Sequence, residues 1–192
     1  MKILILGLVL LLQQEDDSAS VWRSVGSYEG VTSGDDRPVS DAQAELIGKT
    51  LKTDEALKEC EDFEAADSVV GKLRFKRLWL SSDKTETVLA EAGTGCLRGG
   101  QGSNGAMWIV ALNRARVTVL ASPAGGFEGY VYSVPITANK GYRDVVTGWH
   151  DSAFEAGLAY FRFDGIRYRK LSQATARWDD DGKETIIPSA NH

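Results

Sequence analysis

One short polar segment holds most of the residue types that could do chemistry. His150 is the chain's one internal histidine, and Asp151, Ser152 and Glu155 follow it closely. An imidazole beside carboxylates and a hydroxyl group can bind a divalent metal or transfer protons. Together with nearby residues of the same region, these side chains are the candidate binding residues: Asp144, Trp149, His150, Asp151, Ser152, Glu155 and Tyr160.

Three observations favour a structural or recognition role for this segment over catalysis. If the strand continues, its alternation places His150 and Asp151 on opposite faces. A metal site needs three or more converging ligands, and the second histidine of the chain is the terminal His192. No serine sits in the G-x-S-x-G motif of a nucleophile elbow. We therefore assign no catalytic residue, no metal ligand and no cofactor.

Two other segments have the composition of ligand-binding motifs without the required spacing. Residues 93–105 are rich in glycine but lack the Gly-Lys-Ser/Thr ending of a P-loop, and a β-rich run follows them. Residues 179–184 contain three consecutive aspartates, without the alternating ligand positions of a calcium loop. The first segment is interpreted as a long hairpin loop and the second as a hydrated turn.

Antiparallel strands are the elements expected to position the His150 segment. Residues 158–163 and 166–171 have a period of two and flank an aspartate-glycine pair at 164–165. Such a pair suits a two-residue type I′ turn, because both residues tolerate positive φ. With the β-rich run 144–149, this pattern predicts three antiparallel strands. The segment 150–157 is then an exposed connection, where function is commonly placed.

The rest of the chain reads as two short helices followed by short strands. Ser40 and Gln43 fit a capping box at the start of the first helix, and residues 53–66 have apolar positions three apart. Short β-rich runs separated by turn residues indicate an antiparallel β-domain. The fold class is therefore α+β, with two short N-terminal helices and a mostly antiparallel sandwich, barrel or partial propeller-like sheet. The runs are residues 72–80, 86–92, 107–112, 116–121, 129–134, 174–178 and 185–187.

Length and charge limit the organisation and the partners. A chain of 192 residues with 43% hydrophobic content can bury one sizeable core. We expect one globular domain over 21–192, with a loop and helices over 21–68 and a β-rich part over 69–188. The net charge is −5, and no basic surface with interleaved aromatic residues is evident, which argues against a nucleic-acid partner.

The N-terminus has the features of an export signal. Lys2 precedes an apolar run over 3–12, which is too short to span a bilayer and typical of a signal peptide. Small residues permit cleavage after Ser20, although the acidic run 15–17 leaves the position open. The alternative is a buried N-terminal strand. We expect a signal peptide over 1–20 and a periplasmic or secreted monomer without a membrane span in its mature form.

Export also changes the interpretation of the two cysteines. In an oxidising compartment Cys60 and Cys96 can pair in only one way, so a disulfide is predicted. One alternative is a reactive thiol, which needs a nearby base and a reducing compartment. The other is a pair of small buried apolar residues.

Two stretches resemble known sequences. Residues 141–148, GYRDVVTG, resemble the G-Y-x-D-[LV]-V-x-G strand of the FG-GAP and VCBS-type repeats that build β-propeller blades. The calcium motif that usually precedes that strand is missing, and there is no second copy, so the resemblance does not imply a complete propeller. The pattern running from Cys96 through 107–110 to 160–168 resembles small uncharacterised exported bacterial proteins. This broader resemblance covers about half the chain and implies export and a β-rich C-terminal part, but no activity.

The leading functional hypothesis is a non-enzymatic exported binding protein of the bacterial envelope. Aromatic side chains of the strands, together with the His150 segment, would contact a protein or an envelope glycan. One alternative is an inhibitor or immunity-type protein that inserts loop 93–105 or loop 150–157 into a partner enzyme. The other is a hydrolase or metal-dependent enzyme centred on His150. The aromatic residues concerned are Tyr130, Tyr132, Trp149, Tyr160 and Phe161.

Overall fold

Antiparallel strands dominate the protein. The computed structural model describes residues 17–26, 34–35, 37–59, 66–83, 85–93, 97, 105–114 and 116–189. The helices are α1 (Asp17–Trp22), α2 (Asp41–Leu51), α3 (Glu55–Glu59), α4 (Ala66–Gly71) and the single 3-10 turn η1 (Pro123–Gly125). The strands are β1 (Gly34–Asp35), β2 (Arg74–Leu78), β3 (Glu86–Glu91), β4 (Gly105–Asn113), β5 (Arg116–Ala121), β6 (Glu128–Ser133), β7 (Ala138–Asn139), β8 (Tyr142–Arg143), β9 (Val145–His150), β10 (Glu155–Phe163), β11 (Tyr168–Trp178) and β12 (Glu184–Pro188).

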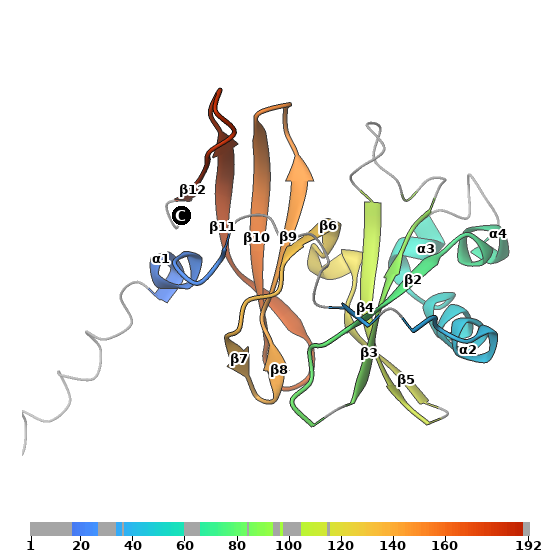
Figure 1. Cartoon of the computed structure of the whole chain (residues 1–192). Helices are drawn as coiled ribbons and strands as arrows, with labels where there is room; N and C mark the ends of the chain where they lie inside the picture. The colour runs from blue at the N-terminus through green and yellow to red at the C-terminus, as the bar shows by residue number, and fades with distance from the viewer. Residues whose placement is uncertain are drawn as a thin grey trace, which may run out of the picture.

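The strands form two groups that face each other. The first group has the order β1-β2-β3-β4-β5, and the second has the order β6-β9-β10-β11-β12. The groups are joined only briefly, where β4 pairs with β6 at Gly105↔Gly129 and Ala106↔Glu128. Strands β7 and β8 form a separate two-stranded ribbon. In Figure 1 the two groups stand side by side, with β9 to β12 on one side and β2 to β5 on the other.

Three apolar clusters place these groups in layers. The central cluster lies between the two groups and contains Leu89 of β3 and Phe161 of β10. A second cluster joins the first group to helices α2 to α4, with Trp108 at its centre. The third lies on the other face of the second group, beneath Trp22 of α1. The architecture is therefore helices, sheet, sheet and a short helix, and the predicted antiparallel β-domain is confirmed (Figure 1).

The prediction of two N-terminal helices is not confirmed as it was made. The helix expected over 53–66 is present only as the short α3, and α4 begins at Ala66 and continues to Gly71. Residues 60–65 lie outside the described part of the chain. A further short helix, α1, covers the third cluster. It spans the predicted cleavage position after Ser20, and residues 1–16 of the predicted signal peptide, like Cys60 and Cys96, lie outside the described set.

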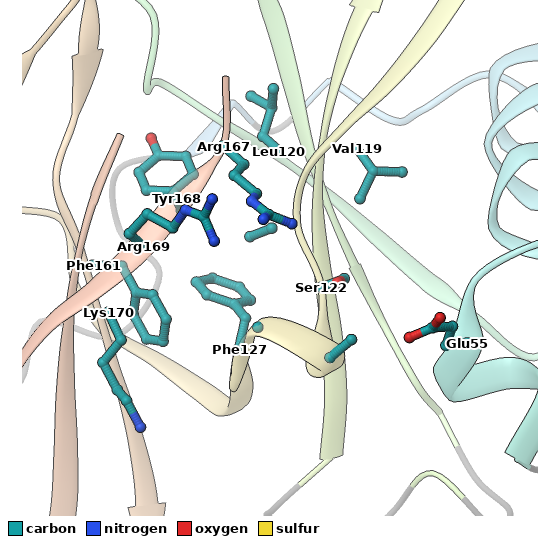
Figure 2. Close-up of a pocket in the computed structure, with 13 residues that line it drawn as sticks. Glu55, Val119, Leu120, Ser122, Phe127, Phe161, Arg167, Tyr168, Arg169 and Lys170 are labelled. Carbon is teal, nitrogen blue, oxygen red and sulfur yellow. The ribbon is translucent and has the colours of Figure 1, made fainter. Parts of the chain in front are cut away.

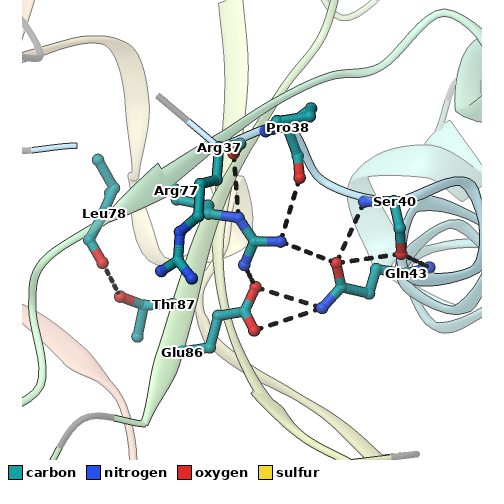
Figure 3. A network of polar contacts seen from close by, with 8 residues as sticks. All are labelled: Arg37, Pro38, Ser40, Gln43, Arg77, Leu78, Glu86 and Thr87. Atoms are coloured by element: carbon teal, nitrogen blue, oxygen red, sulfur yellow. Dashed lines mark hydrogen bonds and ion pairs between the residues drawn. The ribbon is translucent and has the colours of Figure 1, made fainter. Parts of the chain in front are cut away.

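The capping box predicted at the start of α2 is present and has a second role. The Gln43 backbone N–H donates to the Ser40 hydroxyl at 3.3 Å, and the Gln43 side chain accepts from the Ser40 backbone N–H at 3.1 Å. The same side chain reaches Arg77 of β2 at 2.9 Å and Glu86 of β3 at 3.3 Å. Arg77 also pairs with Glu86 (Figure 3). This network attaches α2 to the first strand group.

The β10–β11 hairpin is confirmed, but its turn is longer than predicted. The last paired residues are Phe163 and Tyr168, so four residues separate the strands, and only Gly165 among them has a positive φ, of 106°. The Asp164 side chain accepts the backbone N–H groups of Ile166 and Arg167 at 2.8 and 2.9 Å. That capping explains the difference, because it stabilises a wider turn in which Asp164 itself needs no positive φ.

Candidate functional site

The predicted site residues lie in three separate places. Asp144 precedes β9, whereas His150 ends it, so the length of the strand separates the two side chains. Tyr160 of β10 lies beside Asp144, and Trp149 points to the opposite face of the sheet from His150 because neighbours on a strand alternate. The constellation expected around His150 is therefore not brought together.

Asp144 is the centre of a buried polar cluster. Its Oδ2 accepts the Tyr160 hydroxyl at 2.8 Å and the Arg162 Nε and Nη2 groups at 3.3 and 3.2 Å. The Tyr160 hydroxyl also lies 2.9 Å from that of Thr137. Asp144 is fully buried, and within the described chain its Oδ1 has no hydrogen-bond partner.

Burial and charge shift the pKa values in this cluster. Burial raises the pKa of Tyr160, and the carboxylate of Asp144 adds to the upward shift. Partial burial works to lower the pKa of Arg162, but the hydrogen bond and the charge of Asp144 outweigh it, so the net direction is upward. Asp144 and Tyr160 line neither the groove nor the smaller hollow described below. The cluster therefore ties the segment before β9 to β10, and neither of these two hollows opens onto it.

The His150 segment is an exposed turn. The backbone N–H groups of Asp151 and Ser152 both donate to the Glu155 carbonyl oxygen at 3.1 Å. The Glu155 carboxylate forms an ion pair with Arg177 of the neighbouring strand at 2.7 Å. The His150 ring packs against Tyr130, with centroids 5.1 Å apart. The turn is thus held by its own backbone bonds and by the Glu155–Arg177 ion pair, and these contacts do not converge on a common centre.

Trp149 is held by a glycine on the next strand. Its indole ring lies so close to Gly157 that a Cβ atom there would come within 2.1 Å of the ring. The side chain is half-buried and packs against the central cluster. Trp149 is therefore part of the core between the two strand groups.

Most of the aromatic residues assigned to a binding surface are core residues. Tyr132 and Tyr160 are 0% exposed and Phe161 is 1% exposed, which corrects the expectation that they contact a partner. Periodicity predicted half-buried strands, but both faces of β10 are covered, Phe161 by the central cluster and Tyr160 by the third cluster. Only Tyr130 and Trp149 retain partial exposure.

A surface hollow near Arg77 is also structural. It has a volume of about 150 Å³ and is bordered by Arg77, Trp79 and Glu86. The Arg77 guanidinium donates to the carbonyl oxygens of Arg37 and Pro38 at 3.1 and 3.2 Å, in addition to its contacts with Gln43 and Glu86. Because its donors are used inside the fold (Figure 3), this hollow is a weak candidate for ligand binding.

The stronger candidate site is a groove between the two strand groups. It has a volume of about 440 Å³ and is bordered by β5 and η1 on one side and by the start of β11 on the other. Its accessible apolar surface comes from Val119 and Ala124, and the buried Phe127 and Phe161 lie beneath it with ring centroids 5.1 Å apart and planes at 71°. In Figure 2 the cations of β11 and Glu55 of α3 lie on opposite sides of these rings.

Three cationic side chains at the start of β11 and just before it give the groove a positive wall. Arg167, Arg169 and Lys170 all border it. The Arg169 side chain is engaged by Asp164 at 2.9 Å, and this pairing, after the backbone N–H groups of the turn, holds the pKa of Asp164 well below its usual range. Arg167 and Lys170 have no side-chain partner among the described residues. Two cations beside an apolar surface are therefore available to an anionic ligand.

Sequence reasoning missed this groove. Its one local signal is the basic run formed by Arg167, Arg169 and Lys170 at the start of β11. The opposite wall comes from Val119 to Ser122 and from Glu55, which are distant in sequence. Nothing in the local pattern indicates that these segments meet.

Comparison with known proteins finds no matching family model, curated protein or solved structure. The similarity of residues 141–148 to FG-GAP and VCBS-type repeats, and of the wider pattern to exported bacterial proteins, thus stays a prediction. In the fold, residues 142–143 form β8 and residues 145–148 lie in β9.

Two further findings limit the chemistry of the described residues. They contain no group of three or more His, Cys, Asp or Glu side chains placed to hold a metal ion. Among the helices that the structure describes, none is long and apolar enough to cross a membrane. The loop over 93–105, which the inhibitor hypothesis would use, is described only at Gly93, Leu97 and Gly105.

Proposed function

We propose that this protein is an exported, non-enzymatic binding protein that holds an anionic ligand in the groove between its two strand groups. The observation that carries the proposal is the wall formed by Arg167 and Lys170 beside the accessible apolar surface of Val119 and Ala124. A volume of about 440 Å³ falls within the roughly 300–1,000 Å³ typical of ligand sites.

The groove supplies affinity without supplying a reaction. Apolar contact with Val119 and Ala124, which retain exposed surface, favours the body of a ligand, and the cations favour its negative charge. The groove is bordered by one carboxylate, Glu55, and by no histidine or cysteine. Glu55 lies across the groove from Lys170, and the Tyr168 hydroxyl donates to the Arg143 carbonyl oxygen, so these groups do not form an acid–base pair. Binding in the periplasm or outside the cell is therefore the function that we favour, and the groove replaces the His150 segment as its site.

A fluorescent aromatic sulfonate tests this proposal. Anilinonaphthalene sulfonate has an apolar ring system and one negative charge, which match the apolar surface and the wall. We expect one molecule to bind per chain, and Lys170→Glu to weaken its binding about tenfold, equivalent to 1.4 kcal/mol. Lys183→Glu is the matched control, because Lys183 lies beyond the other end of β11 and makes the same charge change.

Both variants must first have the circular dichroism spectrum and the thermal midpoint of the parent protein, because partly unfolded chains also bind this dye. Equal affinity of the parent and Lys170→Glu would refute the proposal, as would equal weakening by the Lys183→Glu control.

A further inference from the structure

The groove is bordered by strand edges and not by strand faces. Four consecutive residues of the first wall line it, Val119 to Ser122, and four consecutive residues of the second, Arg167 to Lys170. Consecutive side chains of a strand point to opposite faces. A run of four lining residues therefore means that the strand presents its backbone edge to the groove.

Neither of these edges is hydrogen-bonded to a further strand on the groove side in the described chain. Strand β5 pairs with β4 alone. Strand β11 pairs with β12 only from Ala174 to Trp178, which leaves its first half, next to the groove, paired with β10 on one side only. An unpaired edge carries N–H and C=O groups that can accept another strand.

We infer that the ligand of the groove is an extended acidic peptide segment, which binds as an added strand along the edge of β5. This inference rests on the proposed function and specifies its ligand. The backbone of the peptide would pair with β5, as in other β-strand additions. Its acidic side chains would reach Arg167 and Lys170, and the alternate side chains would lie against Val119 and Ala124.

Charge and backbone donors distinguish the β5 edge from the edge of β12, the last strand of the second group. Strand β12 also ends the strand order, but it begins with Glu184 and ends with Pro188. A proline removes a backbone donor, so the β12 edge is less suited to accept an added strand. The β5 edge combines free backbone groups with two cations that have no partner among the described side chains.

The test uses a hexapeptide of alternating glutamate and valine with both ends blocked, so that its charge comes only from side chains. We expect it to bind the full chain, and Lys170→Glu to weaken it about tenfold relative to Lys183→Glu. Two N-methylated versions, each methylated at alternate residues, remove the amide donors of one edge at a time. We expect at least one of them to bind about tenfold more weakly than the parent peptide, because added strands bind through backbone hydrogen bonds.

Hydrogen exchange then locates the peptide. We expect bound peptide to slow amide exchange within β5, Arg116–Ala121. Slowing confined to β12, or equal affinity of the parent and both N-methylated peptides, would overturn the inference. If the aromatic sulfonate binds with the expected Lys170 dependence and the peptide does not, the peptide inference fails and the proposed function stands. If neither probe binds, both fail.

Discussion

Asp144 was selected from the sequence as a candidate for chemistry, and its environment gives it a structural role. It receives three hydrogen bonds on one oxygen from Tyr160 and Arg162 while fully buried. Buried carboxylates persist when donors compensate for their lost hydration. Asp151, which the sequence analysis grouped with Asp144, is exposed. The two carboxylates therefore have different roles.

Replacing the Asp144 carboxylate tests whether it has this structural role. We expect Asp144→Asn to lower the free energy of unfolding by about 2 kcal/mol, because it removes a charged acceptor that is bonded to Tyr160 and Arg162. Asp151→Asn is the control and should change it by less than about 0.5 kcal/mol, as surface substitutions usually do. Urea unfolding measures both, and similar losses for the two variants would contradict the assignment.

Buried tyrosines predict a loss of stability at alkaline pH. Burial raises the pKa of Tyr168, whose hydroxyl donates to the Arg143 carbonyl oxygen at 2.7 Å, and the charge of Asp144 adds to the shift. Above about pH 10, the usual tyrosine pKa, the unfolded chain has lost a proton that the folded chain keeps. The unfolded state then binds fewer protons, so the free energy of unfolding falls as pH rises.

Tyr168→Phe should make that fall less steep, because the variant has no hydroxyl to titrate. Its stability at pH 8 should be about 1 kcal/mol lower than that of the parent, owing to the lost hydrogen bond. Urea unfolding between pH 8 and pH 11 gives both quantities. A parallel decline in the two proteins would show that Tyr168 does not cause the pH dependence.

At the scale of elements, the sequence predicted the capping box of α2, but neither the geometry of the turn after β10 nor the contacts between distant segments. The capping box of Ser40 and Gln43 is confirmed, because all of its bonds lie within four residues. The turn after β10 differs from the prediction because the Asp164 side chain caps two backbone groups, a choice that the Asp-Gly pair alone does not determine. The groove was missed because β5 meets β11 only in the folded chain.

Helix α1 is another element that the local sequence does not predict. Six residues with a mixed composition give no strong helical signal, yet Trp22 is 5% exposed. Its indole N–H donates to the Ser172 hydroxyl at 2.9 Å, and its ring meets Tyr160 edge-on at 5.7 Å. This helix forms because the third cluster accepts its tryptophan. Cleavage after Ser20 would cut α1 but leave Val21 and Trp22 on the mature chain.

The contribution of α1 can be measured through Trp22. We expect Trp22→Ala to lower the free energy of unfolding by about 3 kcal/mol, as large-to-small substitutions of buried aromatics do. Ser172→Ala removes only the hydrogen-bond partner and should cost about 1 kcal/mol. Thermal and urea unfolding provide the comparison. An unchanged Trp22→Ala variant would mean that α1 does not pack on the sheet in solution.

At the scale of the whole molecule, the groove exists because two strand groups are held in one arrangement. Their only strand pairing within the described chain is the short ladder of β4 with β6. Gly129 lies in that ladder with φ of 93°. A Cβ atom there would come within 1.9 Å of the Gly148 carbonyl oxygen of β9. One residue without a side chain thus allows β6 to lie close to β9 while it pairs with β4.

Gly129→Ala should therefore lower the free energy of unfolding by more than the strain of its positive φ alone would. Gly182 provides the control, because its φ of 75° is also positive and a Cβ atom there has nothing within 4 Å. Gly182→Ala should lose about 1 kcal/mol from backbone strain, and Gly129→Ala about 3 kcal/mol or more, because the clash adds to the strain. Urea unfolding measures both losses, and binding of the aromatic sulfonate reports on the groove. Equal losses, or an intact groove in a strongly destabilised Gly129→Ala, would mean that the two strand groups are held together by the central cluster and not by this ladder.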